Sequence, residues 1–349
     1  MNEIKGYYQL SIHPTRTNYY YVPLERRSGN NSKTDFHETT DYVAEKGSQV
    51  SDSVASKMPE QFRDNYHYGK ISKTAERKIN RAIDYLTYLA QPKKLPNTFH
   101  GKGLSFRLNF ITLTLSSEQI HSDHEIMSRL FSPFLQSLRQ KWYVTNYIWR
   151  AERQSSGGIH YHIITDKFIP WSQLRDVWNR HQQNLGYVTR YRANQLNWHR
   201  KGFRPRPDLY KKWSIEKQRK AYNEGIRHDW NSPNSTDVHS LLRISNVRAY
   251  FKKYMTKSGQ SSDIQGRLWG CSLSLTDLKG ATIAIYSSID DELGIIEKQE
   301  SIKTFKGDYF TTIFITPADF KRLGCSELYD VFECYIRERF PDYRPQTLF

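Results

Sequence analysis

Two histidines one residue apart, His160 and His162, lie in the run Gly-Gly-Ile-His-Tyr-His-Ile-Ile-Thr at residues 157–165. The alternation in this run predicts a β-strand that directs both imidazoles to one face, about 7 Å apart by the rise of a strand. At that spacing two neutral imidazoles can bind one divalent cation. Tyr161 is expected to point the other way, into a core. The alternative is that both histidines are surface residues or hydrogen-bonded core residues.

A second segment, Val247–Lys257, contains no Gly or Pro and carries two tyrosines, Tyr250 and Tyr254, four residues apart. On a helix these tyrosines would lie one above the other on a single face. Each is followed three residues later by a lysine, Lys253 or Lys257. A phenol can form a phosphate ester that is later displaced, and a nearby ammonium group favours the phenolate. The alternative is an amphipathic basic helix with packed tyrosines and solvated lysines.

A third segment, Leu108–Ser116, alternates aliphatic residues with threonine or serine and predicts another strand. One face of this strand would carry Phe110, Thr112, Thr114 and Ser116. A strand of this composition is ordinary sheet material. Its importance lies in the order along the chain, in which the threonine-rich strand precedes the histidine pair and the tyrosine helix.

Glu152 is the candidate for a third metal ligand. It lies eight residues before His160 on the segment Tyr147–Gln154, which predicts a strand joined to the histidine strand through a Ser-Ser-Gly-Gly hairpin. Hard cations such as Mg²⁺ or Mn²⁺ prefer oxygen ligands, so two imidazoles alone rarely hold them. The alternative is a surface carboxylate paired with Arg150 or Arg153.

These three segments, in this order, resemble the motifs of the HUH (histidine, hydrophobic, histidine) endonucleases. Within that family they are similar to the two-tyrosine subgroup of rolling-circle replication initiators, which includes initiators of small single-stranded DNA phages and of some plasmids. The resemblance rests on Phe110–Ser116, His160-Tyr161-His162 and Tyr250-Phe251-Lys252-Lys253-Tyr254, and it covers about residues 105–276, roughly half of the chain.

The resemblance implies metal-dependent, site-specific nicking of single-stranded DNA through a 5′-phosphotyrosine, which leaves a free 3′-OH. Tyr250 would make the first nick and Tyr254 the second transfer, while Lys253 and Lys257 would stabilise the phosphate or the phenolate. Other uses of the same chemistry are an HUH transposase and a relaxase-like mobilisation protein, although relaxases usually place the tyrosine ahead of the histidines. A different class is a non-catalytic basic DNA-binding protein.

Composition agrees with a nucleic-acid partner. The chain has 52 Lys and Arg residues against 36 Asp and Glu, a formal net charge of +16, and 14% aromatic residues. Its isoelectric point is near 9.5. Positive charge attracts a polyanion and aromatic rings can stack on unpaired bases, so we expect single-stranded or hairpin origin DNA as the partner. The chain lacks a phosphate-binding Gly-x-x-x-x-Gly-Lys-Ser/Thr motif, so a separate host helicase and a DNA polymerase are expected.

The sequence also bears on location. Mean hydropathy is −0.77, no apolar run approaches 18 residues, and the first residues lack a secretory apolar segment, so no membrane association is expected. The three cysteines form no Cys-x-x-Cys motif and cannot all pair, which favours reduced thiols in the cytoplasm of a bacterial host.

The order of predicted elements favours an α+β fold with a central antiparallel sheet that is backed by helices and has the tyrosine helix over its face. Predicted helices cover residues 72–90, capped by Ser72 or Thr74, 123–142 and 171–185. Residues 234–239 are expected to cap a following helix rather than to bind a second metal, and residues 267–275 to form a return strand.

Three regions are expected along the chain. Residues 1–70 would be a tyrosine-rich, partly irregular extension, residues 71–287 the endonuclease domain, and residues 288–349 a small C-terminal subdomain for packing or partner binding. A basic insertion at about residues 197–238 is either a DNA-gripping element or a solvated excursion, and its density of Arg, Lys, Trp and Tyr favours DNA.

Overall fold

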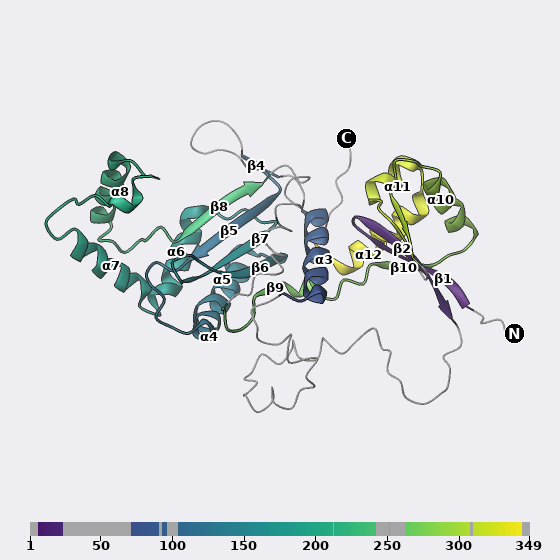
Figure 1. Cartoon of the computed structure of the whole chain (residues 1–349). Coiled ribbons are helices and arrows are strands. Elements are labelled where there is room, and N and C mark those ends of the chain that lie inside the picture. The colour runs from purple at the N-terminus through teal and green to yellow at the C-terminus, as the bar shows by residue number, and fades with distance from the viewer. Residues whose placement is uncertain are drawn as a thin grey trace, which may run out of the picture. The chain divides into compact units, whose positions relative to one another are not determined.

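The computed structural model describes residues 6–23, 71–90, 93–95, 104–211, 213–241, 251, 263–307 and 310–343. The chain divides into two compact units (Figure 1). We call Tyr68–Leu278 the histidine unit, and we call the second, which joins Met1–His67 to Lys279–Pro345, the terminal unit. Each unit contains a five-stranded antiparallel sheet together with helices, which confirms the α+β class.

The sheet of the histidine unit has the strand order β8-β5-β7-β6-β9, so the histidine strand is central. Its strands are β5 (Leu108–Thr114), β6 (Tyr147–Arg153), β7 (Ile159–Thr165), β8 (Thr236–Leu241) and β9 (Trp269–Cys271). The predicted strands β5, β6 and β7 are confirmed, as is the tight hairpin between β6 and β7, in which the Gln154 amide donates to the Gly158 carbonyl at 2.8 Å. A further short ladder pairs β3 (Lys93–Leu95) with β4 (Leu104–Phe106).

The two faces of this sheet differ. On one face Tyr161 is fully buried and stacks on Phe131, with ring centroids 3.7 Å apart. Phe134 packs edge-on against Trp178 on the same helical layer, which comes from residues 126–142 and 171–183. Alternation along β7 therefore leaves His160 and His162 on the opposite face.

Helices of the histidine unit follow the predicted apolar periodicity. Helix α3 starts after its Ser72 N-cap and packs against β6, and its apolar stripe, Ile79, Ile83 and Leu86, is buried. The predicted helix at 123–142 is one continuous element that contains a π-helical stretch. The helical elements are α3 (Lys73–Leu89), α4 (Asp123–Glu125), η1 (Ile126–Phe131), α5 (Ser132–Trp142), α6 (Trp171–Gln183), α7 (Tyr187–Trp198), η2 (Pro207–Leu209), α8 (Ile215–Arg227) and η3 (Leu273–Leu275).

Residues 234–239 do not cap a helix, as expected from the Ser-Thr-Asp pattern, but lead into strand β8. This strand pairs with β5, with Thr236 opposite Leu113 and Asp237 opposite Thr112. Hydrogen bonding to a distant strand has overridden the local capping tendency of these residues. The predicted return strand at 267–275 is shorter than expected, because β9 covers only Trp269–Cys271 before a turn of 3₁₀ helix.

The terminal unit contains a sheet of order β10-β1-β2-β12-β11. Its strands are β1 (Gly6–His13), β2 (Arg16–Pro23), β10 (Ala281–Ala284), β11 (Thr304–Lys306) and β12 (Phe310–Ile313), and its helices are α10 (Ser287–Glu297), α11 (Pro317–Leu323) and α12 (Ser326–Arg339). The division differs from the predicted one. The N-terminal strands pair with β10 and β12 instead of forming a separate extension, and the boundary falls at residue 278 rather than 287.

Two further expectations concern helices and thiols. Among the residues that the structure describes, no helix is both long and apolar enough to cross a membrane. Cys271, Cys325 and Cys334 are free thiols. Burial raises the pKa of the Cys271 thiol to about 11, which keeps it protonated at neutral pH.

Candidate metal centre

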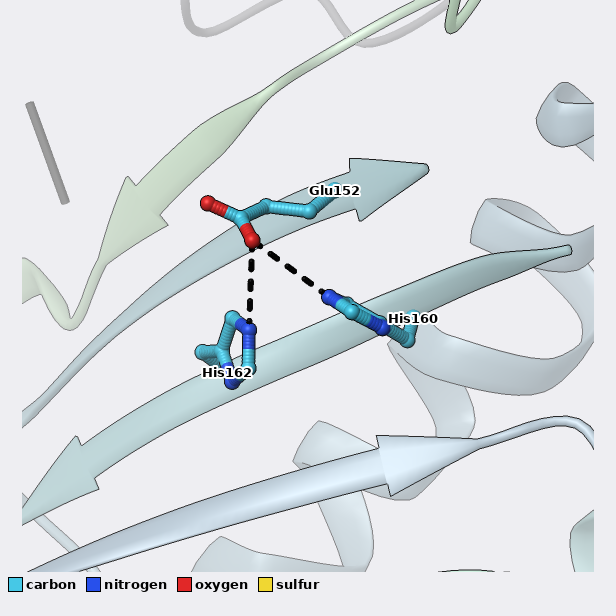
Figure 2. A group of neighbouring side chains, drawn as sticks. All are labelled: Glu152, His160 and His162. Atoms are coloured by element: carbon cyan, nitrogen blue, oxygen red, sulfur yellow. Dashed lines mark hydrogen bonds and ion pairs between the residues drawn. The ribbon is translucent and has the colours of Figure 1, made fainter. Parts of the chain in front are cut away.

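Three side chains converge on the open face of the central strands, as Figure 2 shows. Glu152 on β6 is paired with His160 on β7, and His162 lies two residues further along β7. The Oε2 atom of Glu152 is 3.4 Å from Nε2 of His160 and 3.4 Å from Nε2 of His162. The antiparallel register thus brings together the three ligands that sequence spacing predicted.

This group could hold a metal ion. Its three ligand atoms all lie within 4.8 Å of one another. Two imidazole nitrogens and one carboxylate oxygen form a donor set that suits a divalent cation of the first transition row, and the carboxylate also suits harder cations. The side chains of Glu152, His160 and His162 are only 15%, 15% and 9% exposed, so water competes little for these atoms.

Thr112 supports one of the imidazoles. It lies directly opposite His162 in the β5–β7 ladder, and its hydroxyl oxygen is 3.1 Å from Nδ1 of His162. When Nδ1 carries the proton and donates it to this hydroxyl, the lone pair is on Nε2, the atom that faces Glu152. By contrast, Nδ1 of His160 is buried and has no hydrogen-bond partner within the described part of the chain.

Arg150 is a neighbour whose place at the site the sequence did not predict. Its Nε atom lies 3.5 Å from Oε1 of Glu152, and it stands opposite His162 in the β6–β7 ladder. Both interpretations of Glu152 are therefore correct, because one oxygen contacts the imidazoles and the other contacts Arg150. Burial lowers the pKa of Arg150, and the charge of Glu152 partly offsets this effect. The arginine nevertheless stays charged, since its unperturbed pKa is so high.

Arg153, the other predicted partner of Glu152, instead holds the end of the hairpin. Its guanidinium donates to Asp123 at 2.7 Å and to Asp263 at 2.9 Å. Although burial of the Asp123 carboxyl raises its pKa, hydrogen bonds from Arg153, Gln119 and a backbone amide more than compensate and hold that pKa below its usual value. Gln119 also accepts a hydrogen bond from the Ile159 amide, so this network fixes the start of the histidine strand.

A stack of three rings lies beside the metal group. The Phe110 ring stacks on the His162 imidazole, with centroids 5.1 Å apart, and also on Phe251, with centroids 5.7 Å apart. Phe251 is helical and fully buried. It is the only described residue of the predicted tyrosine helix. The predicted catalytic residues Tyr250, Lys253, Tyr254 and Lys257 lie outside the described residues.

Comparison with known proteins supports a role in replication. No curated protein and no solved structure matches this chain significantly. Residues 108–259 do match a protein family, that of the replication-associated protein ORF2. The matched segment begins with β5, includes all three candidate metal ligands and extends past the tyrosine pair. This similarity supports a replication initiator.

Proposed function

We propose that this protein initiates rolling-circle replication by nicking single-stranded origin DNA in a metal-dependent reaction of the HUH two-tyrosine type. The observation that carries the proposal is the convergence of His160, His162 and Glu152 on one sheet face, within the segment that matches the replication-associated family. The burial of Phe251 against Phe110 adds support, because Tyr250 directly precedes Phe251 in the sequence.

Mg²⁺ or Mn²⁺ is the proposed ion at this group. Bound there, it would polarise the scissile phosphate and favour in-line attack. His162 is oriented for this task by Thr112, and Glu152 brings a negative charge that the cation neutralises. Arg150 lies close enough to Glu152 to present its guanidinium to a phosphate oxygen at the same face.

Tyr250 is the proposed nucleophile for the first cut. Its phenolic oxygen attacks the phosphorus, the bond from phosphorus to the 3′ oxygen breaks, and a 5′-phosphotyrosine forms. The phenolic proton is lost and the departing 3′ oxygen gains one, so no oxidant and no nucleotide triphosphate is needed. Lys253 is proposed to stabilise the phenolate and the phosphate charge.

Tyr254 is the proposed nucleophile for the second transfer. One helical turn separates residues four positions apart, so a second phenol could reach the same phosphate site after a small shift. Lys257, three residues after Tyr254, would act there as Lys253 acts beside Tyr250. The two transfers together would release a closed circle.

The proposed substrate is DNA whose bases are unpaired at the cut site, either a single strand or an extruded hairpin. A separate host helicase would open the duplex, and a host DNA polymerase would extend the free 3′-OH. This division of work follows from the lack of a nucleotide-binding motif in the sequence.

The test is to map the covalent DNA–peptide adduct after incubation with a single-stranded origin oligonucleotide and Mg²⁺ or Mn²⁺. We expect the adduct on Tyr250, its loss in Tyr250→Phe, and retained nicking without second transfer in Tyr254→Phe. Tyr143→Phe is the matched control, since this tyrosine is 74% exposed and lies outside the three motifs. An adduct that persists in the double Tyr250→Phe, Tyr254→Phe variant would contradict the proposal.

The same experiment separates an enzyme from a non-catalytic DNA-binding protein, since the latter would bind the oligonucleotide without cutting it. Side-by-side reactions on one origin sequence as single strand, relaxed linear duplex and supercoiled circle test the strand state. We expect poor cleavage of the relaxed duplex. Equal rates on all three would show that the protein melts DNA itself.

A further inference from the structure

Residues 187–230, which we call the basic hairpin, hold an unusual concentration of positive charge. This segment contains helices α7 and α8 and has twelve Lys or Arg residues against four Asp or Glu. The surplus of eight positive charges is half of the formal +16 of the whole chain. A surface of this kind is attracted to a polyanion.

The aromatic rings of the basic hairpin are mostly occupied with one another. His199 stacks on Trp230, with centroids 5.3 Å apart and planes 8° apart, and Tyr222 lies 4.7 Å from His199. Trp230 is only 7% exposed, and its ring passes so close to Gly225 that an added Cβ would lie 2.1 Å from it. These rings form a small core of their own and are not available to stack on bases.

Arginines cover other rings of the same element. The Arg204 guanidinium lies 4.0 Å from the centre of the Trp198 ring, and that of Arg219 lies 4.5 Å from Phe203. Such cation–π contacts hold a guanidinium in place while its outer N–H groups still face solvent. They therefore present fixed positive charges rather than bare aromatic surfaces.

Several cations of the basic hairpin have no acidic partner. Arg200, Lys201, Lys211 and Lys217 are exposed, and none has a carboxylate within ion-pair distance among the residues that the structure describes. Their charge is neutralised only by counterions in the free protein. Phosphate groups that displaced those counterions would gain free energy from their release.

The basic hairpin starts beside the candidate metal centre. The hydroxyl of Tyr187, the first residue of α7, accepts hydrogen bonds from the backbone amides of Ile120 and His121. The adjacent Gln119 accepts from the amide of Ile159, the residue before His160. DNA held by the hairpin would therefore continue toward the strand that carries the histidines.

We propose that the basic hairpin binds the phosphate backbone of duplex DNA that flanks the unpaired cut site. Duplex rather than single-stranded DNA is the inferred partner because the rings that could stack on unpaired bases are largely buried or covered by arginine. The charges, in contrast, are abundant and fixed on helices. The inference rests on the proposed function, because it assigns a second DNA segment to the same initiator.

The experiment uses the full chain with Arg200→Gln, Lys201→Gln, Lys211→Gln and Lys217→Gln combined. The matched control removes the same charge from the terminal unit through Lys279→Gln, Lys298→Gln, Lys303→Gln and Lys306→Gln, all exposed. Fluorescence anisotropy measures Kd at several salt concentrations for a blunt duplex of about 20 base pairs and for a single strand of equal length. Circular dichroism verifies that both variants are folded.

We expect the hairpin variant to bind the duplex on the order of a hundredfold more weakly near 0.1 M salt, with a salt slope reduced by about 3. The control should keep wild-type affinity. Cleavage of a short single strand should also be unchanged in the hairpin variant. Equal weakening by the control variant, or equal loss of single-strand and duplex binding by the hairpin variant, would overturn the inference. A protein that cuts no DNA but shows the expected duplex loss would refute only the proposed function.

Discussion

The two five-stranded sheets share a plan but differ in what their open faces carry. In the terminal unit, Leu10 and Ile12 are fully buried under the helices, whereas the opposite face exposes aromatic rings: Tyr7 is 38%, Phe310 47% and Phe305 55% exposed. In the histidine unit the corresponding face holds buried charged and polar groups. Among all described residues, the only group with converging metal ligands is Glu152, His160 and His162.

The difference shows that the architecture alone does not set the chemistry. Both sheets are antiparallel and alternate inward and outward residues, so both could place a pair of side chains on one face. Within the described residues, β7 alone places two imidazoles there and finds a carboxylate on the neighbouring strand. The following substitutions, most of them made in equivalent pairs on the two sheets, test how far this contrast holds.

Replacement of both His160 and His162 by alanine should have the largest effect. We expect metal-dependent DNA cleavage to fall by on the order of a thousandfold or more, since the stabilisation of phosphate charge is lost. The matched change on the terminal sheet is Gln9→Ala with Tyr20→Ala, two side chains that hydrogen-bond to each other at 3.1 Å. Titration calorimetry with Mn²⁺ and a cleavage assay provide the measurements. Normal cutting by the histidine variant would remove the metal centre from the account.

Tyr161→Ala should destabilise the fold by about 3–5 kcal/mol, because it empties a fully buried site against Phe131. Phe305→Ala on the exposed face of the terminal sheet should change the free energy of unfolding by about 0.5 kcal/mol or less. Urea denaturation followed by circular dichroism measures both. Similar losses in the two variants would mean that the exposed ring is covered in solution.

Thr112→Val should weaken metal binding by about 10–100-fold while the unfolding free energy changes little, because it removes the hydrogen bond that orients His162. The matched control is Thr312→Val, which removes a hydroxyl that donates to Asn18 at 2.8 Å on the terminal sheet. Metal affinity is measured by calorimetry. An unchanged affinity for Thr112→Val would show that packing alone holds the imidazole.

Asp123→Asn should lower stability by about 2 kcal/mol at neutral pH, since the ion pair with Arg153 loses its charge. The folded pKa of Asp123 lies below its usual value of 3.8. Its contribution is therefore complete above that value and disappears as pH falls through the lower, folded pKa. Urea denaturation from neutral pH down to about pH 3 should show the gap between wild type and variant closing only in the acidic part of this range. A gap that stays constant to the lowest pH would contradict this assignment.

Strands β5, β6 and β7 could be predicted because each alternates over several residues, and the Ser-Ser-Gly-Gly turn between two of them fixed their neighbours. The same pattern identified Glu152 as a ligand, since a short hairpin sets register. Thr112 could be placed on the correct face, but its contact with His162 depends on pairing between strands some fifty residues apart.

Other features depend on partners far away in the chain and left no local signal. Strand β8 has the composition of a helix cap and becomes a strand only through its pairing with β5. The tyrosine-rich start of the chain looks irregular alone, yet β2 pairs with β12 nearly three hundred residues later. Arg150 was visible only as a possible ion-pair partner, because its burial at the site follows from the pairing of β9 with β6.

The central position of β7 has a consequence for how fast and how tightly an ion can be captured. Hydrogen-bonded strands flank it on both sides, so its backbone amides are expected to exchange with solvent only in the most global opening events. The ligands on β7 are consequently arranged by the folding of the sheet itself, before any cation arrives. Binding then needs little further ordering of the chain, so the affinity of the site reports the match between ion and ligands with only a small entropic penalty.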